Sequence, residues 1–251
     1  MKYLVFILSV LFLFQSCQEQ VDPFAHIGDD ALKAVLQKSI DYHGGLDAWQ
    51  DLNKMRFNKD FKLLDRHGIV EKSFEQIHDY NYADDHYEII SKERMIYTDT
   101  IISKLKDGVF SRTKNGIAAE DSPEKIEKTI NSGTYVVGIP FKLLDPNVKL
   151  SLEEEEFEGE AVYTIQAAYN SDQNDNHSTN DVWKYYIAKN TGKVIANWVD
   201  AGDHQNIINN ITFKRINGIL LNEHRESYRL DSLGNKAYKR AIYFYKNYEL
   251  K

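Results

Sequence analysis

Hydrophobic and polar positions divide the chain into a helical opening and a long series of strands. Between Asp29 and His43 the apolar residues recur every three or four positions, which predicts an amphipathic helix. Asp29 or Asp30 can cap its start, and Gly44-Gly45 can end it because glycine tolerates left-handed backbone geometry. The face that this helix buries is expected to carry Leu32, Val35, Leu36, Ser39 and Ile40.

After a shorter predicted helix at Leu46–Leu52, the hydrophobic period changes to about 2. Met55, Phe57, Phe61 and Leu63 alternate with polar residues, as in a strand with one solvated face. The alternation predicts further strands at Phe74–Tyr80, Tyr87–Ile90, Arg94–Asp99 and Ile101–Lys106.

The middle of the chain combines a second helix with the most apolar segment outside the N-terminus. Asp121-Ser122-Pro123-Glu124 has the capping oxygens and the first-turn proline of a helix start, and the helix is expected to stop at Gly133. Tyr135–Leu144 follows, and Pro140 prevents this segment from being one straight helix. The segment is interpreted either as a lid over a ligand cavity or as permanent core, and core is the commoner role.

The second half of the chain reads as strand after strand. Asn217-Gly218 between two strand-like runs predicts a hairpin, and the sequential spacing favours an antiparallel meander. We therefore expect one α+β domain over residues 29–251, a large curved antiparallel sheet (an incomplete β-barrel) with helices covering the concave side. The expected strands are Val148–Phe157, Ala161–Tyr169, Val182–Ala188, Val194–Val199, Ile207–Ile216, Ile219–Leu230 and Lys236–Tyr248.

The N-terminus has the layout of an export signal. Lys2 precedes an apolar run, Tyr3–Phe14. The run is too short to span a membrane, because a spanning helix needs about 20 apolar residues. Gln15 and Ser16 follow the run, and the cut is expected just before Cys17, the only cysteine of the chain. This arrangement resembles a bacterial lipoprotein signal, which implies removal of residues 1–16, lipidation of Cys17, and a tether over residues 17–28. An ordinary signal with an incidental cysteine, or an uncleaved anchor, is the alternative.

Charge and cysteine content exclude several kinds of protein. The net charge of −7 makes nucleic acid a poor partner, because binding there depends on basic residues that neutralise phosphates. Anionic headgroups would also repel the chain, so a lipid anchor rather than a basic patch is expected to hold it at a membrane. With Cys17 modified, no thiol remains for a disulfide, a metal site or catalysis.

Three motifs in order along the chain resemble a known group of envelope proteins. They are His43-Gly44-Gly45-Leu46-Asp47-Ala48-Trp49, Ile139-Pro140-Phe141-Lys142-Leu143-Leu144-Asp145-Pro146, and Trp183–Ile187 with the following Thr191-Gly192 turn. Together they resemble the LolA/LolB-like lipoprotein-carrier superfamily, and the second resembles uncharacterised Bacteroidetes envelope lipoproteins. The resemblance implies a half-barrel whose concave side holds acyl chains. An anchored chain resembles an acceptor or a resident binding protein more than a diffusing carrier.

Four groups of polar residues that could suggest catalysis or metal binding are each interpreted as structural. His43 suits the last turn of a helix, where the helix dipole favours it. Asp84-Asp85-His86 cannot converge on one metal ion if extended. The loop Asp172–His177 lacks the glycine and the bidentate acid of an EF-hand. Glu153–Glu156 is expected to be a solvated strand edge. No metal site and no cofactor is predicted, and no nucleophile elbow or dinucleotide fingerprint is present.

The leading hypothesis is a non-enzymatic, lipid-anchored envelope protein that is exported, is expected at the outer membrane, and binds a lipid or a lipoprotein acyl chain. An apolar cavity of roughly 300–1,000 Å³ in the concave face would favour it. A filled interior would favour a protein-interaction or sensor module with a protein partner not yet known, and a hydrolase is a third alternative. The candidate cavity or lid residues are Phe57, Phe61, Tyr135, Val137, Ile139, Phe141, Leu143, Trp183, Tyr185 and Trp198.

Overall fold

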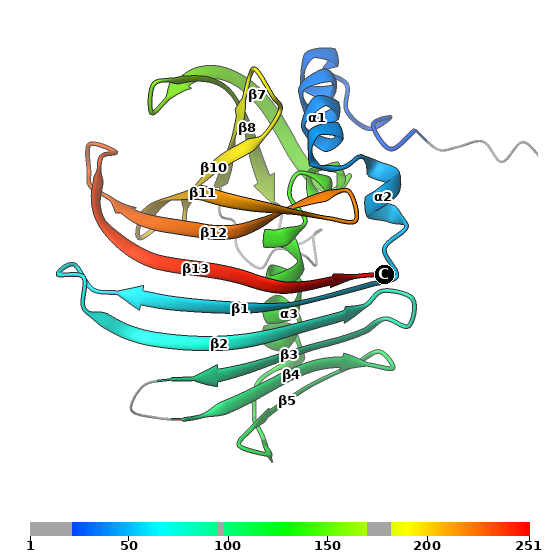
Figure 1. The fold of residues 1–251 in the computed structure, drawn as a ribbon, viewed down its shortest axis with the longest axis vertical. Helices are drawn as coiled ribbons and strands as arrows, with labels where there is room; N and C mark the ends of the chain where they lie inside the picture. Colours follow the sequence, from blue (N-terminus) through cyan, green and yellow to red (C-terminus); the bar gives the residue numbers. More distant parts are fainter. Residues whose placement is uncertain (1–21, 95–97, 170–181) are drawn as a thin grey trace, which may run out of the picture.

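The structure, a computed structural model, describes residues 22–94, 98–169 and 182–251 (Figure 1). The export signal, Cys17 and the Asp172–His177 loop therefore lie outside the described residues. The helices are α1 (Asp30–His43), α2 (Leu46–Gln50), α3 (Pro123–Val137) and the short 3-10 helix η1 (Phe141–Leu144). The strands are β1 (Lys54–Leu64), β2 (Val70–Asn81), β3 (His86–Glu93), β4 (Thr100–Lys106), β5 (Val109–Lys114), β6 (Ile117–Ala118), β7 (Val148–Phe157), β8 (Glu160–Tyr169), β9 (Val182–Ala188), β10 (Val194–Asp200), β11 (Gln205–Ile216), β12 (Ile219–Leu230) and β13 (Lys236–Leu250).

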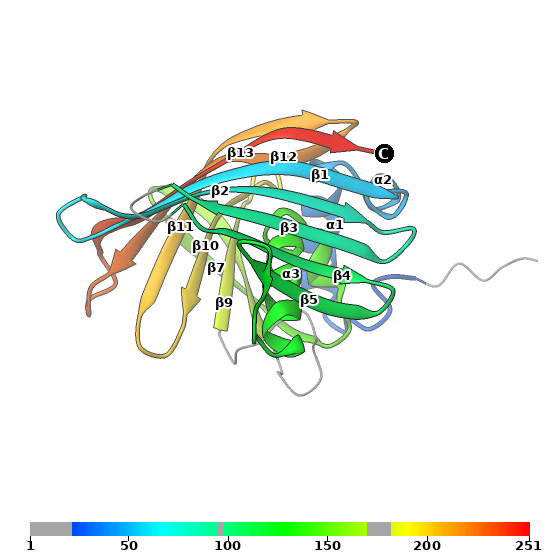
Figure 2. The ribbon, with the colours of Figure 1, turned by 90° about the horizontal axis from the view of Figure 1, so that it is seen from below.

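In the described part of the chain the strands form one 13-stranded sheet, in the order β6-β5-β4-β3-β2-β1-β13-β12-β11-β10-β9-β8-β7. The chain thus starts in the middle of the sheet, runs outward to β6, and resumes at the opposite edge with β7. Helix α3 is the connection between those two edges, and it crosses the hollow side of the sheet (Figure 2). The predicted fold class, a curved antiparallel half-barrel with helices, is confirmed.

Helix α1 has the caps and the buried face that its sequence predicts. The Asp29 carboxylate accepts hydrogen bonds from the backbone N–H groups of Ala31 and Leu32, at 2.8 and 3.1 Å. At the other end Gly44 has a φ of +127°, and a Cβ there would lie 2.7 Å from the carbonyl oxygen of Gly218 in the β11–β12 turn. Glycine is therefore required both to end the helix and to let the hairpin approach.

Helix α3 is longer than its sequence predicts. Ser122 caps its start as expected, but the helix continues through Gly133 and ends at Val137, with Gly138 as its C-cap. Gly133 is needed for close packing, since a Cβ there would lie 2.3 Å from the Tyr80 hydroxyl oxygen. The prediction that Pro140 interrupts the apolar segment is confirmed, because η1 follows α3 as a separate turn.

Two further segments differ from expectation. Arg94–Asp99 was expected as a strand, but its described residues connect β3 to β4, since the backbone N–H of Glu93 already bonds to the carbonyl of Asp99 across the hairpin. Phe24 and Ile27, in the expected tether, are buried in the main core, so packing begins earlier in the chain than Asp29. Among the described residues, no helix combines the length and the hydropathy required to cross a bilayer.

A candidate ligand cavity between helix α3 and the sheet

A cavity of about 210 Å³ lies between α3 and the strands β1, β9, β10, β11, β12 and β13. Helix α3 and the residue after its cap contribute one stripe of its lining, with side chains at positions i, i+3, i+4 and i+7. Ser132 at the start of this stripe is exposed, which places it at the rim. The lining residues are Lys59, Ser132, Tyr135, Val136, Ile139, Trp183, Tyr185, Asn197, Ile208, Arg225, Tyr243 and Tyr245.

Four of the ten residues predicted from the sequence line this cavity: Tyr135, Ile139, Trp183 and Tyr185. The first pair comes from α3 and its C-terminal end. The second pair comes from alternate positions of β9, which place both aromatic rings on the concave face, with centroids 6.3 Å apart.

The other six predicted residues lie elsewhere. Val137, Phe141 and Leu143 are buried in the main core, and so is Phe57, whose ring stacks on that of His78. Phe61 stacks on Phe74. Trp198 packs against the second, smaller core cluster instead, because its neighbour Asn197 takes the position that faces the cavity.

Three tyrosine hydroxyls meet beside the cavity. The hydroxyl of Tyr169 is hydrogen-bonded to those of Tyr135 and Tyr185, the latter at 3.0 Å. Burial raises the pKa of all three hydroxyls above the ordinary value of 10. They are therefore neutral at physiological pH and join α3 to β8 and β9 as hydrogen-bonding groups.

Two cations at the cavity wall were not predicted. Arg225 is only 5% exposed, and Lys59 extends over the rings of Phe61, Tyr243 and Tyr245 at 5.1–5.9 Å. The sequence gives no signal for the inward position of Arg225, because Asn222-Glu223-His224-Arg225-Glu226 is polar throughout. A period of 2 cannot show which phase of such a run faces the interior.

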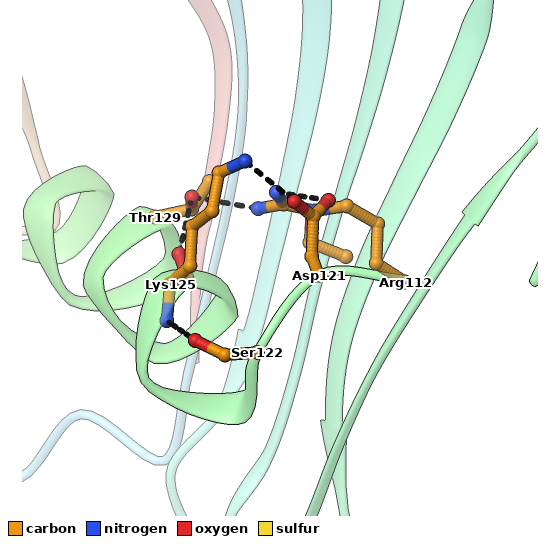
Figure 3. A network of polar contacts seen from close by, with 6 residues as sticks. Arg112, Asp121, Ser122, Lys125 and Thr129 are labelled. Carbon is orange, nitrogen blue, oxygen red and sulfur yellow. Dashed lines mark hydrogen bonds and ion pairs between the residues drawn. The ribbon is translucent and has the colours of Figure 1, made fainter. Parts of the chain in front are cut away.

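The beginning of α3 is attached to the sheet by a polar network outside the cavity (Figure 3). Arg112 of β5 donates hydrogen bonds to Ser103, Asp121 and Thr129 at 2.7–2.9 Å. Lys125 forms a second ion pair with Asp121. The hydrogen bonds from Lys125 and Arg112 hold the pKa of the Asp121 carboxyl below its usual value. This network fixes the N-terminal half of α3 on β4 and β5.

The remaining sequence candidates have structural roles. His43 is buried and donates a hydrogen bond to the Ser39 carbonyl at 2.8 Å, and burial lowers its pKa to about 4. It is therefore neutral, and desolvation outweighs the helix-dipole effect invoked for it. Asp84 and Asp85 lie in a turn rather than a strand, and the described residues contain no group of three metal-ligating side chains. Glu153–Glu156 occupies β7 at the sheet edge and is exposed, as predicted.

Comparison with solved structures gives likeness of fold. A DUF1329 family protein from Desulfovibrio piger shares 11% sequence identity, with 89% of this chain and 94% of that chain covered and a TM-score of 0.54. Mycobacterium tuberculosis lipoprotein LppX shares 12% identity over 86% of this chain and 95% of its own, with a TM-score of 0.33. The Pseudomonas aeruginosa MucA/MucB complex gives 9% identity over 86% of this chain and 56% of that chain, with a TM-score of 0.29. No protein-family model matches, and no curated protein matches.

Proposed function

We propose that this protein is a non-enzymatic binding protein of the bacterial envelope, anchored through Cys17, that holds an apolar ligand between α3 and the sheet. The observation that carries the proposal is the aromatic-lined cavity, to which α3 and six strands contribute. Pockets that bind small molecules are mostly apolar with a few polar groups, as this one is. The N-terminal sequence and the resemblance to lipoprotein carriers support the envelope location.

The size of the cavity limits what it encloses. At about 210 Å³ it is smaller than the roughly 300–1,000 Å³ of a typical ligand pocket. Three of the candidate lid residues (Val137, Phe141 and Leu143) fill the neighbouring space as permanent core. The cavity as it stands accepts a short acyl segment, and a full-length chain requires displacement of α3 or passage over the rim at Ser132.

Ligand binding is tested on the chain from Gln18 onward, which retains every described residue. Native mass spectrometry after gentle purification should reveal a co-bound lipid, and a fluorescent fatty acid should bind. Ile208→Trp fills the cavity from β11 and should reduce fatty-acid affinity at least tenfold. Leu233→Trp, at a side chain 84% exposed in the β12–β13 turn, is the matched control and should bind normally.

The proposal is wrong if no lipid is retained and no fatty acid binds. Recovery of a specific protein partner under those conditions would instead establish the interaction module. The packed core around Leu143, which is 0% exposed, is the observation that favours this second function.

A further inference from the structure

Arg225 is a buried charge whose described partners are all neutral. Its Nε donates to the amide oxygen of Asn210 at 2.8 Å, and its Nη2 donates to the amide oxygen of Asn197 at 3.3 Å. Asn210 is itself held in place, since its amide nitrogen donates to the Val194 carbonyl at 3.0 Å. The two amides orient the guanidinium group but supply no negative charge.

Among the described residues, no counter-ion for Arg225 lines the cavity. The lining residues include no Asp or Glu, and among the described residues neither Arg225 nor Lys59 forms a salt bridge. Tyr185 and Tyr243 cannot replace a carboxylate, because burial raises the pKa of both hydroxyls, that of Tyr243 to about 12. The described lining thus has a formal charge of +2 in a chain whose net charge is −7.

A buried, unpaired charge is costly to retain, and arginine cannot escape the cost by losing its proton. An anion that enters the cavity would supply the missing partner. A carboxylate suits the guanidinium group best, since its two oxygens can accept two parallel N–H bonds. The Lys59 ammonium group would also attract the carboxylate. It extends from β1, which β13 separates from the β12 strand of Arg225.

We infer that the ligand of this cavity is a monoanionic amphiphile, with a carboxylate bound at Arg225 and Lys59 and an apolar body against Trp183, Tyr245 and Ile139. This inference rests on the proposed function and specifies its ligand class. The cavity volume equals roughly seven water volumes at about 30 Å³ each, enough for the carboxylate and a short acyl segment.

The test compares ligands that differ only in the head or only in the tail. Binding of octanoate, octanol, acetate and inorganic phosphate is measured by titration calorimetry on the full chain in amphipol and on the chain from Gln18 onward. Octanoate is expected to bind at least tenfold more tightly than octanol and at least tenfold more tightly than acetate or phosphate. In Arg225→Met, octanoate should bind no better than octanol, whereas Arg225→Lys should retain part of the preference.

Circular dichroism establishes whether Arg225→Met folds. If it does not, Lys59→Met is used instead, because the Lys59 side chain is only half-buried and its replacement is better tolerated. This variant should lower the preference for octanoate over octanol about threefold or more.

The outcomes separate the two proposals. Equal binding of octanoate and octanol to the unchanged chain overturns the carboxylate site and leaves the apolar-ligand function standing. Equal binding of acetate or phosphate and octanoate shows an anion site with no apolar contribution and overturns the amphiphile. Absence of binding by all four ligands overturns both.

Discussion

Helix α3 divides the concave face of the sheet into two unlike halves. Toward β3, β4 and β5 the helix contacts the sheet directly, with Ile126 and Ile130 buried, and Gly133 lies close to the Tyr80 hydroxyl of β2. Toward β9–β13 the same helix leaves the cavity that contains Arg225. The chain must cross the sheet to join β6 to β7, and the crossing helix is held by contacts with β3–β5 and by the tyrosine hydroxyls of β8 and β9. The space that remains on the second half is the cavity.

The two halves also differ in how their polar groups are satisfied. On the packed half, His78 lies in a closed chain, in which the Tyr80 hydroxyl is hydrogen-bonded to Nδ1 at 2.8 Å and Gln76 to Nε2 at 3.2 Å. Arg112 is paired with Asp121 on the same half. On the cavity half, Arg225 is oriented by amides and has no described acidic partner. A closed network stabilises packing, whereas an open one favours a ligand.

Of the changes considered, acid pH is expected to lower the free energy of unfolding the most, because each half contains a buried neutral histidine. Burial lowers the pKa of His43 to about 4, and burial lowers that of His78 well below 6.5. The unfolded chain binds these protons near pH 6.5, so stability is complete above that pH and is lost as the pH falls below it. From pH 7 to pH 5, His43 alone should cost about 2 kcal/mol, and His78 adds to this loss.

Urea unfolding at both pH values measures this loss, in the unchanged chain and in His43→Gln and His78→Gln. Each variant should show a smaller loss of unfolding free energy between the two pH values. A pH dependence that is identical in all three proteins would contradict the assignment. If only one variant changes it, the acid sensitivity belongs to that half of the concave face.

A methyl group at Gly133 tests the close packing of the β2 side. Gly133→Ala places a Cβ about 2.3 Å from the Tyr80 oxygen, and overpacking costs of about 1–3 kcal/mol exceed the gain of about 1 kcal/mol in helix propensity. A net loss of up to about 2 kcal/mol in unfolding free energy is expected. Tyr80→Phe removes the clashing oxygen, so the double variant should recover part of the loss in a double-mutant cycle. Ser132→Ala, on the exposed rim, is the control and should have no measurable effect.

The smallest expected effect concerns the polar network at the start of α3. Arg112→Met removes three hydrogen bonds from a side chain only 10% exposed, and should cost about 1 kcal/mol in unfolding free energy. Octanoate affinity should be unchanged, because the network lies on the other half of the face. Lys114→Met, at an exposed ion pair with Asp99, is the matched control and should cost less. A loss of octanoate binding in Arg112→Met would show that the two halves are coupled.

The local pattern of hydrophobic and polar residues was sufficient to predict most of the helices and strands. The strands from β7 to β13 follow the predicted alternation closely, and Asn217-Gly218 forms the expected turn. The end of α3 was predicted wrongly, at Gly133, because glycine often marks the end of a helix. Here Gly133 lies inside the helix and allows close packing against the Tyr80 hydroxyl. The candidate site was predicted in part, since Trp183 and Tyr185 alternate clearly on one face.

By itself, the sequence determined the helices, the antiparallel series of strands and the aromatic character of the concave face, because periodicity reports which side chains share a side. Only the tertiary structure decided that Arg225 faces inward, that Trp198 faces outward and that α3 leaves a cavity on one half of the face. These outcomes depend on contacts between distant segments. The burial of Arg225 requires Asn197 and Asn210 on two other strands. A local pattern contains no information about such partners.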